Sequence, residues 1–239
     1  MNKGVSVIIT GLMLISLSAC SNVNNQVNSV NSQTEASLPE PDTVITESVR
    51  PSSEPEDPTT KFEPPLLASG EVVVEFDYLA QSGHASNQFA VWIEDADGSL
   101  VKTLYATRYT ANGGYKNRPD SISIWVDKSD VASMDKKQID AITGATPKSG
   151  ALSYTWNLTD TNGDSVQPGE YSVFLEGSLR WKNKVLYSGK IVVGSSHATI
   201  QADAEYIYET AQGQAALTSD SPETAMIGNV TVRFIPACS

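Results

Sequence analysis

The segment WNLTDTNGDSVQPGEY, residues 156–171, contains the clearest turn signals in the chain. Asn162-Gly163 and Pro168-Gly169 are pairs that reverse the chain direction, because glycine reaches backbone angles that other residues avoid and proline fixes its own φ angle. Tyr171 then begins a run typical of a strand, with its ring available for a core. The segment therefore predicts neighbouring strands joined by tight polar turns.

The acidic residues of this segment allow a second interpretation. Asp160, Asn162 and Asp164 alternate along the chain, and alternating oxygen donors suit a hard cation such as Ca²⁺. The run lacks the rest of a calcium loop and its distant bidentate glutamate. A hairpin turn is the favoured interpretation.

Short alternating or aliphatic runs separated by turn residues continue from about residue 69 to the end of the chain. They predict strands at 70–78, 87–95, 100–107, 121–125, 152–158, 171–176, 185–193, 204–208 and 230–235. One helix is predicted over 129–139, with Ser129 or Asp130 as N-cap and three residues facing inward: Val131, Met134 and Ile139. We therefore predict an all-β fold over residues 68–237, an antiparallel immunoglobulin-like β-sandwich with one short helix.

The N-terminal residues have the features of an export signal. Lys3 precedes an apolar run at 5–17, which is shorter than the roughly 20 residues that a membrane-spanning helix needs. The run ends in Leu17-Ser18-Ala19-Cys20, which resembles the bacterial lipobox. The resemblance implies that residues 1–19 are a signal peptide. It also implies that lipid on Cys20 anchors the protein to the extracytoplasmic face of a membrane, facing the periplasm or the cell surface.

Residues 20–67 have a composition that cannot form a core. They are rich in Asn, Ser, Pro and Glu, almost lack aromatic residues, and contain many more acidic residues than the two basic ones, Arg50 and Lys61. We predict a disordered acidic linker between the anchor and the folded domain. The net charge of the whole chain is −12, which argues against nucleic acid as a partner.

The sequence predicts neither a catalytic set nor a metal site, so a stand-alone enzyme is not expected. His84 and His197 are the only histidines, no nucleophile-elbow pattern is present, and no Cys/His cluster has zinc spacing. A histidine-dependent hydrolase is a distant alternative. If Cys20 carries lipid, Cys238 has no partner within the chain for a disulfide, and it either pairs between molecules or has no role.

Paired carboxylates and tryptophans have structural interpretations. The pairs Glu94-Asp95 and Asp203/Glu205 are expected to be exposed residues near strand ends. Three tryptophans are expected to anchor the core, while Trp181 lies between Arg180 and Lys182 and is expected to be partly exposed; the core set is Trp92, Trp125 and Trp156.

The segment DAITGAT, residues 140–146, is the most suggestive chemically. It resembles the flavinylation motif of extracytoplasmic flavin-binding domains, in which a flavin transferase moves FMN from FAD onto the last threonine. The resemblance implies a phosphodiester-linked FMN on Thr146, with four recognition positions at Asp140, Thr143, Gly144 and Ala145. The alternative is that Gly144 and Gly150 only shape the connection between the helix and the next strand.

Two family resemblances cover the folded part. The 156–171 segment is similar to the immunoglobulin-like domain of flagellar hook-capping proteins. The motif at 140–147, the 156–171 segment, and the runs 100–104 and 229–236 together resemble the family called domain of unknown function 2271, over about residues 70–236. That family comprises predicted periplasmic or surface proteins, often encoded near flavin transferases and membrane redox components. The resemblance implies a carrier or accessory protein in extracytoplasmic electron transfer. The alternative is a non-enzymatic immunoglobulin-like binding or assembly module at the cell surface.

Overall fold

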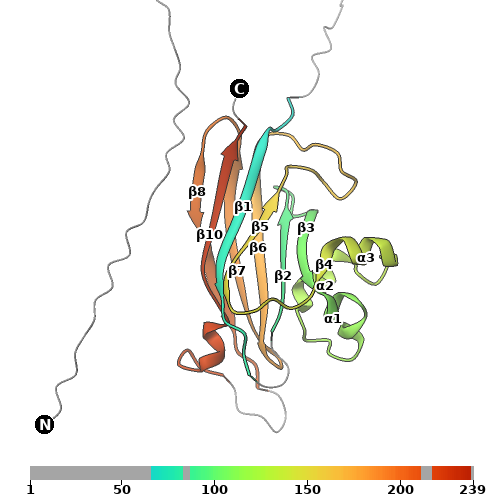
Figure 1. The fold of residues 1–239 in the computed structure, drawn as a ribbon, viewed down its shortest axis with the longest axis vertical. Coiled ribbons are helices and arrows are strands. Elements are labelled where there is room, and N and C mark those ends of the chain that lie inside the picture. The colour runs from blue at the N-terminus through green and yellow to red at the C-terminus, as the bar shows by residue number, and fades with distance from the viewer. Residues whose placement is uncertain (1–65, 83–86, 211–216, 238–239) are drawn as a thin grey trace, which may run out of the picture. The chain divides into compact units, whose positions relative to one another are not determined.

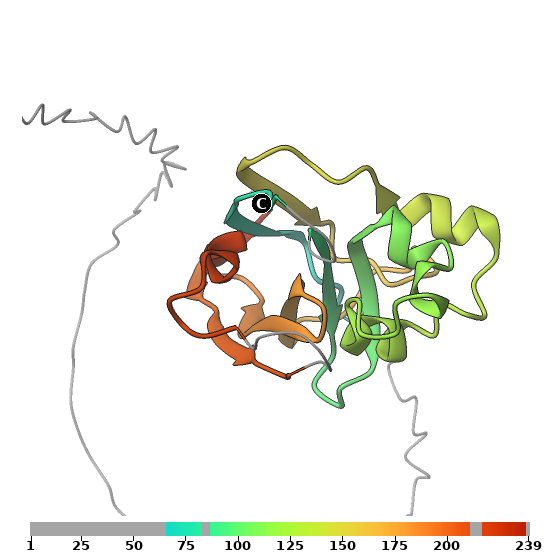
Figure 2. The same cartoon turned by 90° about the horizontal axis from the view of Figure 1, so that it is seen from below.

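The strands of the chain form two sheets packed face to face (Figure 1 and Figure 2). The computed structural model describes residues 66–82, 87–210 and 217–237. The signal peptide, Cys20, nearly all of the linker, His84 and Cys238 lie outside these residues. The two sheets confirm the predicted all-β sandwich.

The first sheet has the strand order β5-β1-β10-β8, and its neighbouring strands are antiparallel. Its strands are β1 (Gly70–Tyr78), β5 (Gly150–Trp156), β8 (Ala198–Gln201) and β10 (Ile227–Pro236). The register of β1 with β10 joins Gly70 to Pro236, so the first and last strands of the described chain are neighbours.

The second sheet has the strand order β4-β3-β2-β6-β7-β9. Its strands are β2 (Gln88–Glu94), β3 (Leu100–Thr107), β4 (Thr143–Gly144), β6 (Gly169–Arg180), β7 (Asn183–Val193) and β9 (Asp203–Ile207). The pair β3–β4 is parallel and only two residues long, whereas the other neighbours are antiparallel. Eight of the nine predicted strands are confirmed, two with the predicted ends and six with shifted ends, and β4 and β8 were not predicted.

The main core lies between the two sheets. Alternation along β1 turns Val72, Val74, Phe76 and Tyr78 inward, because successive side chains of a strand point to opposite faces. Aromatic and aliphatic side chains of β2, β3, β6 and β7 meet them from the facing sheet, and β10 contributes to the same layer from the sheet of β1. This apolar layer supplies most of the favourable free energy of folding.

The 156–171 segment forms the predicted corner between the sheets. The Trp156 side chain is fully buried, its ring meets that of Tyr171 at 4.9 Å between centroids, and its Nε1 donates to the carbonyl of Thr159 at 2.8 Å. The Tyr171 hydroxyl donates to the carbonyl of Gln167 at 2.7 Å, a bond typical of the tyrosine corner of immunoglobulin-like sandwiches.

The backbone of the polar turn inside this segment donates hydrogen bonds to Asp160, an acidic residue of the same turn. The Oδ1 atom of Asp160 accepts from the backbone N–H groups of Asn162 and Asp164, at 2.8 and 2.9 Å. Thr159 and Ser165 form a β-bridge that closes the hairpin. Over the ranges that the structure covers, no group of three or more His, Cys, Asp or Glu side chains could hold a metal ion. The β-bridge and the two hydrogen bonds to Asp160 confirm the predicted hairpin turn.

A layer of short helices covers the outer face of the second sheet beside β2 and β3 (Figure 2). It occupies residues 108–142 and contains α1 (Arg108–Ala111), the 3₁₀ helix η1 (Gly114–Lys116), α2 (Ser123–Ser129) and α3 (Lys136–Ile142). We call these residues the helical insert. A second 3₁₀ helix, η2 (Pro222–Met226), precedes β10. The chain thus has more short helices than the single one predicted.

The helical insert encloses a second apolar core against the sheet. Trp125, Ile122 and Val131 pack on Trp92 and Ala90, which point outward from β2. Phe89, Val91 and Ile93 point the other way into the main core, so every residue of β2 is buried. Trp92, Trp125 and Trp156 are thus confirmed as core residues, and Trp181 is 39% exposed as predicted.

Two predictions in this region are wrong. Residues 121–125 were predicted as a strand, but they lead into α2, because side chains of the sheet accept the N–H groups of Ile122, Ile124 and Trp125. The helix predicted over 129–139 is divided, since α2 ends at Ser129 and Asp130 takes a left-handed backbone conformation. The next helix, α3, begins after Asp135, which forms a capping box with Gln138.

Within the described residues, no helix is long and apolar enough to cross a membrane.

Candidate functional site

The DAITGAT segment lies at the edge of the second sheet, where the helical insert returns to the sandwich (Figure 1). Asp140 is in the last turn of α3, Thr143 and Gly144 form β4 beside Ala106 and Thr107 of β3, and the last two residues begin the connection to β5. Ala145 and Thr146 are exposed. The predicted attachment residue is thus on an accessible irregular segment, as its chemistry requires.

The backbone next to Thr146 is held by Tyr105. The Tyr105 hydroxyl donates to the carbonyl of Ala145 at 3.0 Å. Burial, with a smaller contribution from Tyr78, raises the pKa of Tyr105 to about 12, so the phenol keeps its proton as a donor at neutral pH. The Tyr105 ring also explains Gly144, because a Cβ atom there would lie 2.9 Å from its Cε2 atom.

The remaining recognition positions differ in exposure. Asp140 is exposed and forms an ion pair with Arg108 at 3.5 Å, whereas Thr143 is half-buried. The Thr143 hydroxyl is buried without a hydrogen-bond partner, as is that of Thr107 on the neighbouring strand. A buried hydroxyl without a partner is costly, so nothing within the described fold accounts for a threonine at position 143.

The geometry of this segment fits a covalently attached group. The hydroxyl-bearing Thr146 is exposed, and so is the small residue before it, Ala145. Pro147 follows it and biases Thr146 toward an extended backbone. The five predicted residues thus lie on one segment, and the Tyr105 hydroxyl holds its backbone at Ala145.

A pocket of about 280 Å³ lies beside this segment, between α3 and the edge of β3. Its walls come from four segments: the helix α3, the residues just before α3, the strand β3, and the 156–171 turn. The lining residues are Lys102, Thr103, Met134, Gln138, Ala141, Ile142 and Thr161. Sequence reasoning missed this pocket, because its walls come from segments that only the fold brings together.

A buried carboxylate joins the helical insert to the sheet. Glu176 on β6 is 0% exposed and accepts from the backbone N–H groups of Trp125, at 2.9 Å, and Ile124, at 3.3 Å. The Lys184 ammonium lies 3.9 Å away and also donates to the Ser123 hydroxyl. Burial raises the pKa of Glu176 to about 7, and the two N–H groups and Lys184 oppose this effect only in part.

Other polar groups of the sheet hold the insert in the same way. Ser178 accepts from the N–H of Ile122 at 3.0 Å, and Thr103 accepts from Trp125 Nε1 at 3.1 Å. Glu94 accepts from Trp92 Nε1 at 2.7 Å and from Lys128 at 3.1 Å.

Glu94 was expected to be exposed, and this was wrong because the insert covers it. A glutamate within an apolar strand, such as Glu176 between Leu175 and Gly177, is the sequence signal for such an anchor.

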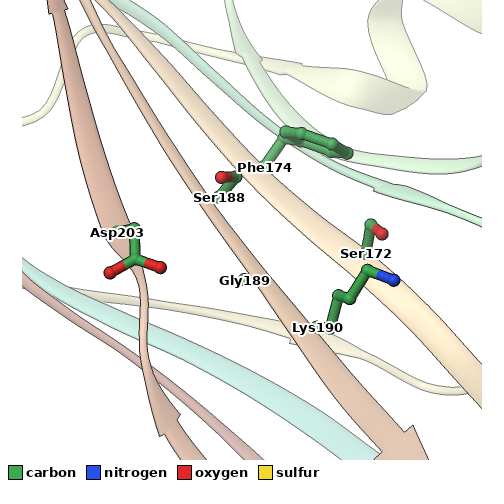
Figure 3. Close-up of a pocket in the computed structure, with 6 residues that line it drawn as sticks. All are labelled: Ser172, Phe174, Ser188, Gly189, Lys190 and Asp203. Atoms are coloured by element: carbon green, nitrogen blue, oxygen red, sulfur yellow. The ribbon is translucent and has the colours of Figure 1, made fainter.

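The other predicted polar residues do not assemble into a site. His197 is exposed near the start of β8, and Asp203 and Glu205 are exposed on β9 as expected. A shallow groove of about 400 Å³ crosses the outer face of β6, β7 and β9 (Figure 3), lined by Ser172, Phe174, Ser188, Gly189, Lys190 and Asp203. None of the flavinylation-motif residues lines this groove.

Valine in place of Gly144 is expected to destabilise the edge of the sheet. Its side chain would force the Tyr105 ring to move or β4 to separate, and overpacking of this kind costs about 1–3 kcal/mol. Urea denaturation measures the loss. Gly169→Val is the matched control, because a Cβ at Gly169 meets nothing within 4 Å. Equal losses in the two variants would contradict the contact with Tyr105.

One comparison with known proteins identifies relatives of the chain. A family model described as "Predicted periplasmic protein (DUF2271)" matches residues 70–209, which is more than half of the chain and includes the DAITGAT segment and the 156–171 corner. No curated protein and no solved structure matches significantly.

Proposed function

The chain belongs to the DUF2271 family of predicted periplasmic proteins, and from this premise we propose that it carries FMN covalently bound to Thr146. In this proposal it is a carrier or accessory protein of extracytoplasmic electron transfer. Its partners are a flavin transferase, which modifies it, and membrane redox components, with which it exchanges electrons. The observation that carries the proposal is the exposed Thr146, next to the Ala145 carbonyl that Tyr105 holds.

The attachment step is a transfer of a phosphoryl-linked group. The Thr146 hydroxyl oxygen bonds to the phosphorus of the FMN half of FAD, the bond from that phosphorus to the AMP half breaks, and AMP leaves. The hydroxyl proton passes to a base of the transferase. No electrons are exchanged in this step. Once bound, FMN supplies one- and two-electron redox chemistry, while the chain keeps it from diffusing away.

The test is co-expression with an active flavin transferase. The chain is expected to gain the mass of one FMN and to fluoresce as a flavin in a denaturing gel, and Thr146→Ala is expected to lose both signals completely. Thr155→Ala is the matched control, since Thr155 is an exposed threonine on β5 outside the motif. An unmodified mass, while the same cells modify a known acceptor, would overturn the proposal. So would a modified Thr146→Ala variant.

We also propose that lipid on Cys20 anchors this carrier to the membrane. The lipobox-like Leu17-Ser18-Ala19-Cys20 supports this proposal, because its small residues and thiol suit lipid transfer and cleavage. Cys20→Ser is expected to move the protein from the membrane fraction to the soluble fraction and to abolish labelling by a radioactive fatty acid. Cys238→Ser is the control and should keep both properties. A Cys20→Ser protein that stays in the membrane fraction with its label would refute the anchor.

A further inference from the structure

The pocket beside α3 has walls that belong to the flavinylation motif itself. Ala141 and Ile142, the two residues between Asp140 and Thr143, line it from α3. We propose that this pocket binds the isoalloxazine ring of the flavin. The identity of the ligand rests on the proposed function, but the pocket can be tested without any covalent attachment.

The size of the pocket suits the ring and not the whole cofactor. Its volume of about 280 Å³ is at the lower limit of ligand pockets, which usually measure ~300–1,000 Å³. The ring system therefore enters, and the ribityl phosphate arm stays outside. That arm leads back along the two-residue strand β4 to Thr146.

The distance along the chain permits this arrangement. Ile142 lines the pocket and Thr146 lies four residues later, so their Cα atoms are at most ~14 Å apart even if the chain is fully extended. The Tyr105 hydroxyl holds the carbonyl of Ala145, but the Tyr105 ring packs in the main core, whereas Thr103 faces Trp125 of the helical insert. The ribityl arm would therefore pass around the edge of β4 between the pocket and Thr146.

The chemistry of the walls matches the two ends of a flavin ring. Met134, Ala141 and Ile142 give an apolar side for the dimethylbenzene end, and methionine adapts well to aromatic faces. Lys102 and Gln138 give a polar side for the pyrimidine end, whose carbonyl oxygens accept hydrogen bonds and whose N3–H donates one. The Lys102 ammonium, which also donates to the Asp160 carbonyl, places positive charge where a reduced flavin gains negative charge.

Riboflavin tests the pocket, because it has the ring but no phosphate to attach. Titration of the purified, unmodified chain should give saturable quenching of riboflavin fluorescence. Ala141→Trp fills the pocket from α3 and should weaken the affinity about tenfold or more, a change of ~1.4 kcal/mol. Ala132→Trp is the matched control, an exposed alanine of the helical insert that does not line the pocket, and should change it less than about twofold.

A second variant shows whether a loss of affinity in Ala141→Trp comes from a filled pocket or from misfolding. Thr161→Trp fills the pocket from the 156–171 turn, so a shared loss of affinity cannot come from damage to α3 alone. The pocket proposal fails if riboflavin does not bind, or if both tryptophan variants bind it as well as the control does. Thr146→Ala separates the two proposals. It should bind riboflavin normally, so the pocket can stand even if no FMN is ever attached.

Discussion

Glutamine in place of Glu176 is expected to remove a fall in stability that we predict for the native protein between about pH 4.5 and pH 7. In the unfolded chain Glu176 titrates near its ordinary value of 4.5, whereas burial raises its pKa in the folded chain to about 7. Between these values the folded state holds a proton that the unfolded state has released. The free energy of unfolding therefore decreases as the pH rises through this range, and the contribution of Glu176 is complete only below the lower pKa.

The size of this effect follows from the two pKa values. Their difference corresponds to about 3 kcal/mol, and the carboxyl is fully buried, so solvent screening reduces it little. Glutamine resembles the protonated carboxyl in shape and cannot titrate, so this part of the pH dependence should disappear. Urea denaturation at several pH values measures it.

The control is Glu205→Gln on β9, which changes an exposed glutamate of the same sheet and leaves Glu176 in place. This variant should keep the decline predicted for the native protein. Lys184 and Asp127 also influence Glu176, and both remain unchanged in the two variants. Parallel stability curves for the native protein and Glu176→Gln between pH 4.5 and 7 would show that the buried carboxyl does not titrate there.

Alanine in place of Trp156 should cost about 3–5 kcal/mol of unfolding free energy, the usual range for the loss of a fully buried large aromatic side chain. The change removes the contact with the Tyr171 ring and the bond from Nε1 to the Thr159 carbonyl. Because the corner connects the two sheets, the loss should affect the whole sandwich. Thermal and urea denaturation measure it.

Tyr171→Phe is a milder change at the same corner, to be compared with Trp156→Ala. It keeps the ring contact with Trp156 and removes only the bond to the Gln167 carbonyl, so a loss of about 1 kcal/mol is expected. Trp181→Ala is the negative control, since Trp181 is partly exposed in the β6–β7 hairpin, and it should change stability much less. If Trp156→Ala and Trp181→Ala lost similar amounts, the corner would not be a main support of the fold.

The strands could be predicted because their signals are local. Alternation along 70–78 and the turn pairs at Asn162-Gly163 and Pro168-Gly169 depend on neighbouring residues alone. The helical insert could not be predicted in this way, since residues 121–125 alternate like a strand. Their helical start depends on Glu176 and Ser178, more than fifty residues later. One local signal was present, because Asp135 and Gln138 have the spacing of a capping box.

The candidate site also combines features that local sequence predicts with features that only tertiary contacts explain. The motif predicts Thr146 as the attachment residue, and this stays a prediction; the structure adds that Thr146 is exposed. The reason for Gly144 lies in Tyr105, whose ring comes from another strand, and no local pattern indicates that contact. The pocket formed by α3, β3 and the turn at Thr161 is likewise a product of tertiary packing.

The pairing of β1 with β10 also sets a limit on when the protein can fold. Gly70 of β1 pairs with Pro236 of β10, and pairing between strands so far apart in the chain forms slowly. The first sheet stays incomplete until the C-terminal strand is available. Under the proposed export, this delay would keep the chain unfolded while it crosses the membrane. Truncation at the C-terminus would remove the strand that completes the sheet.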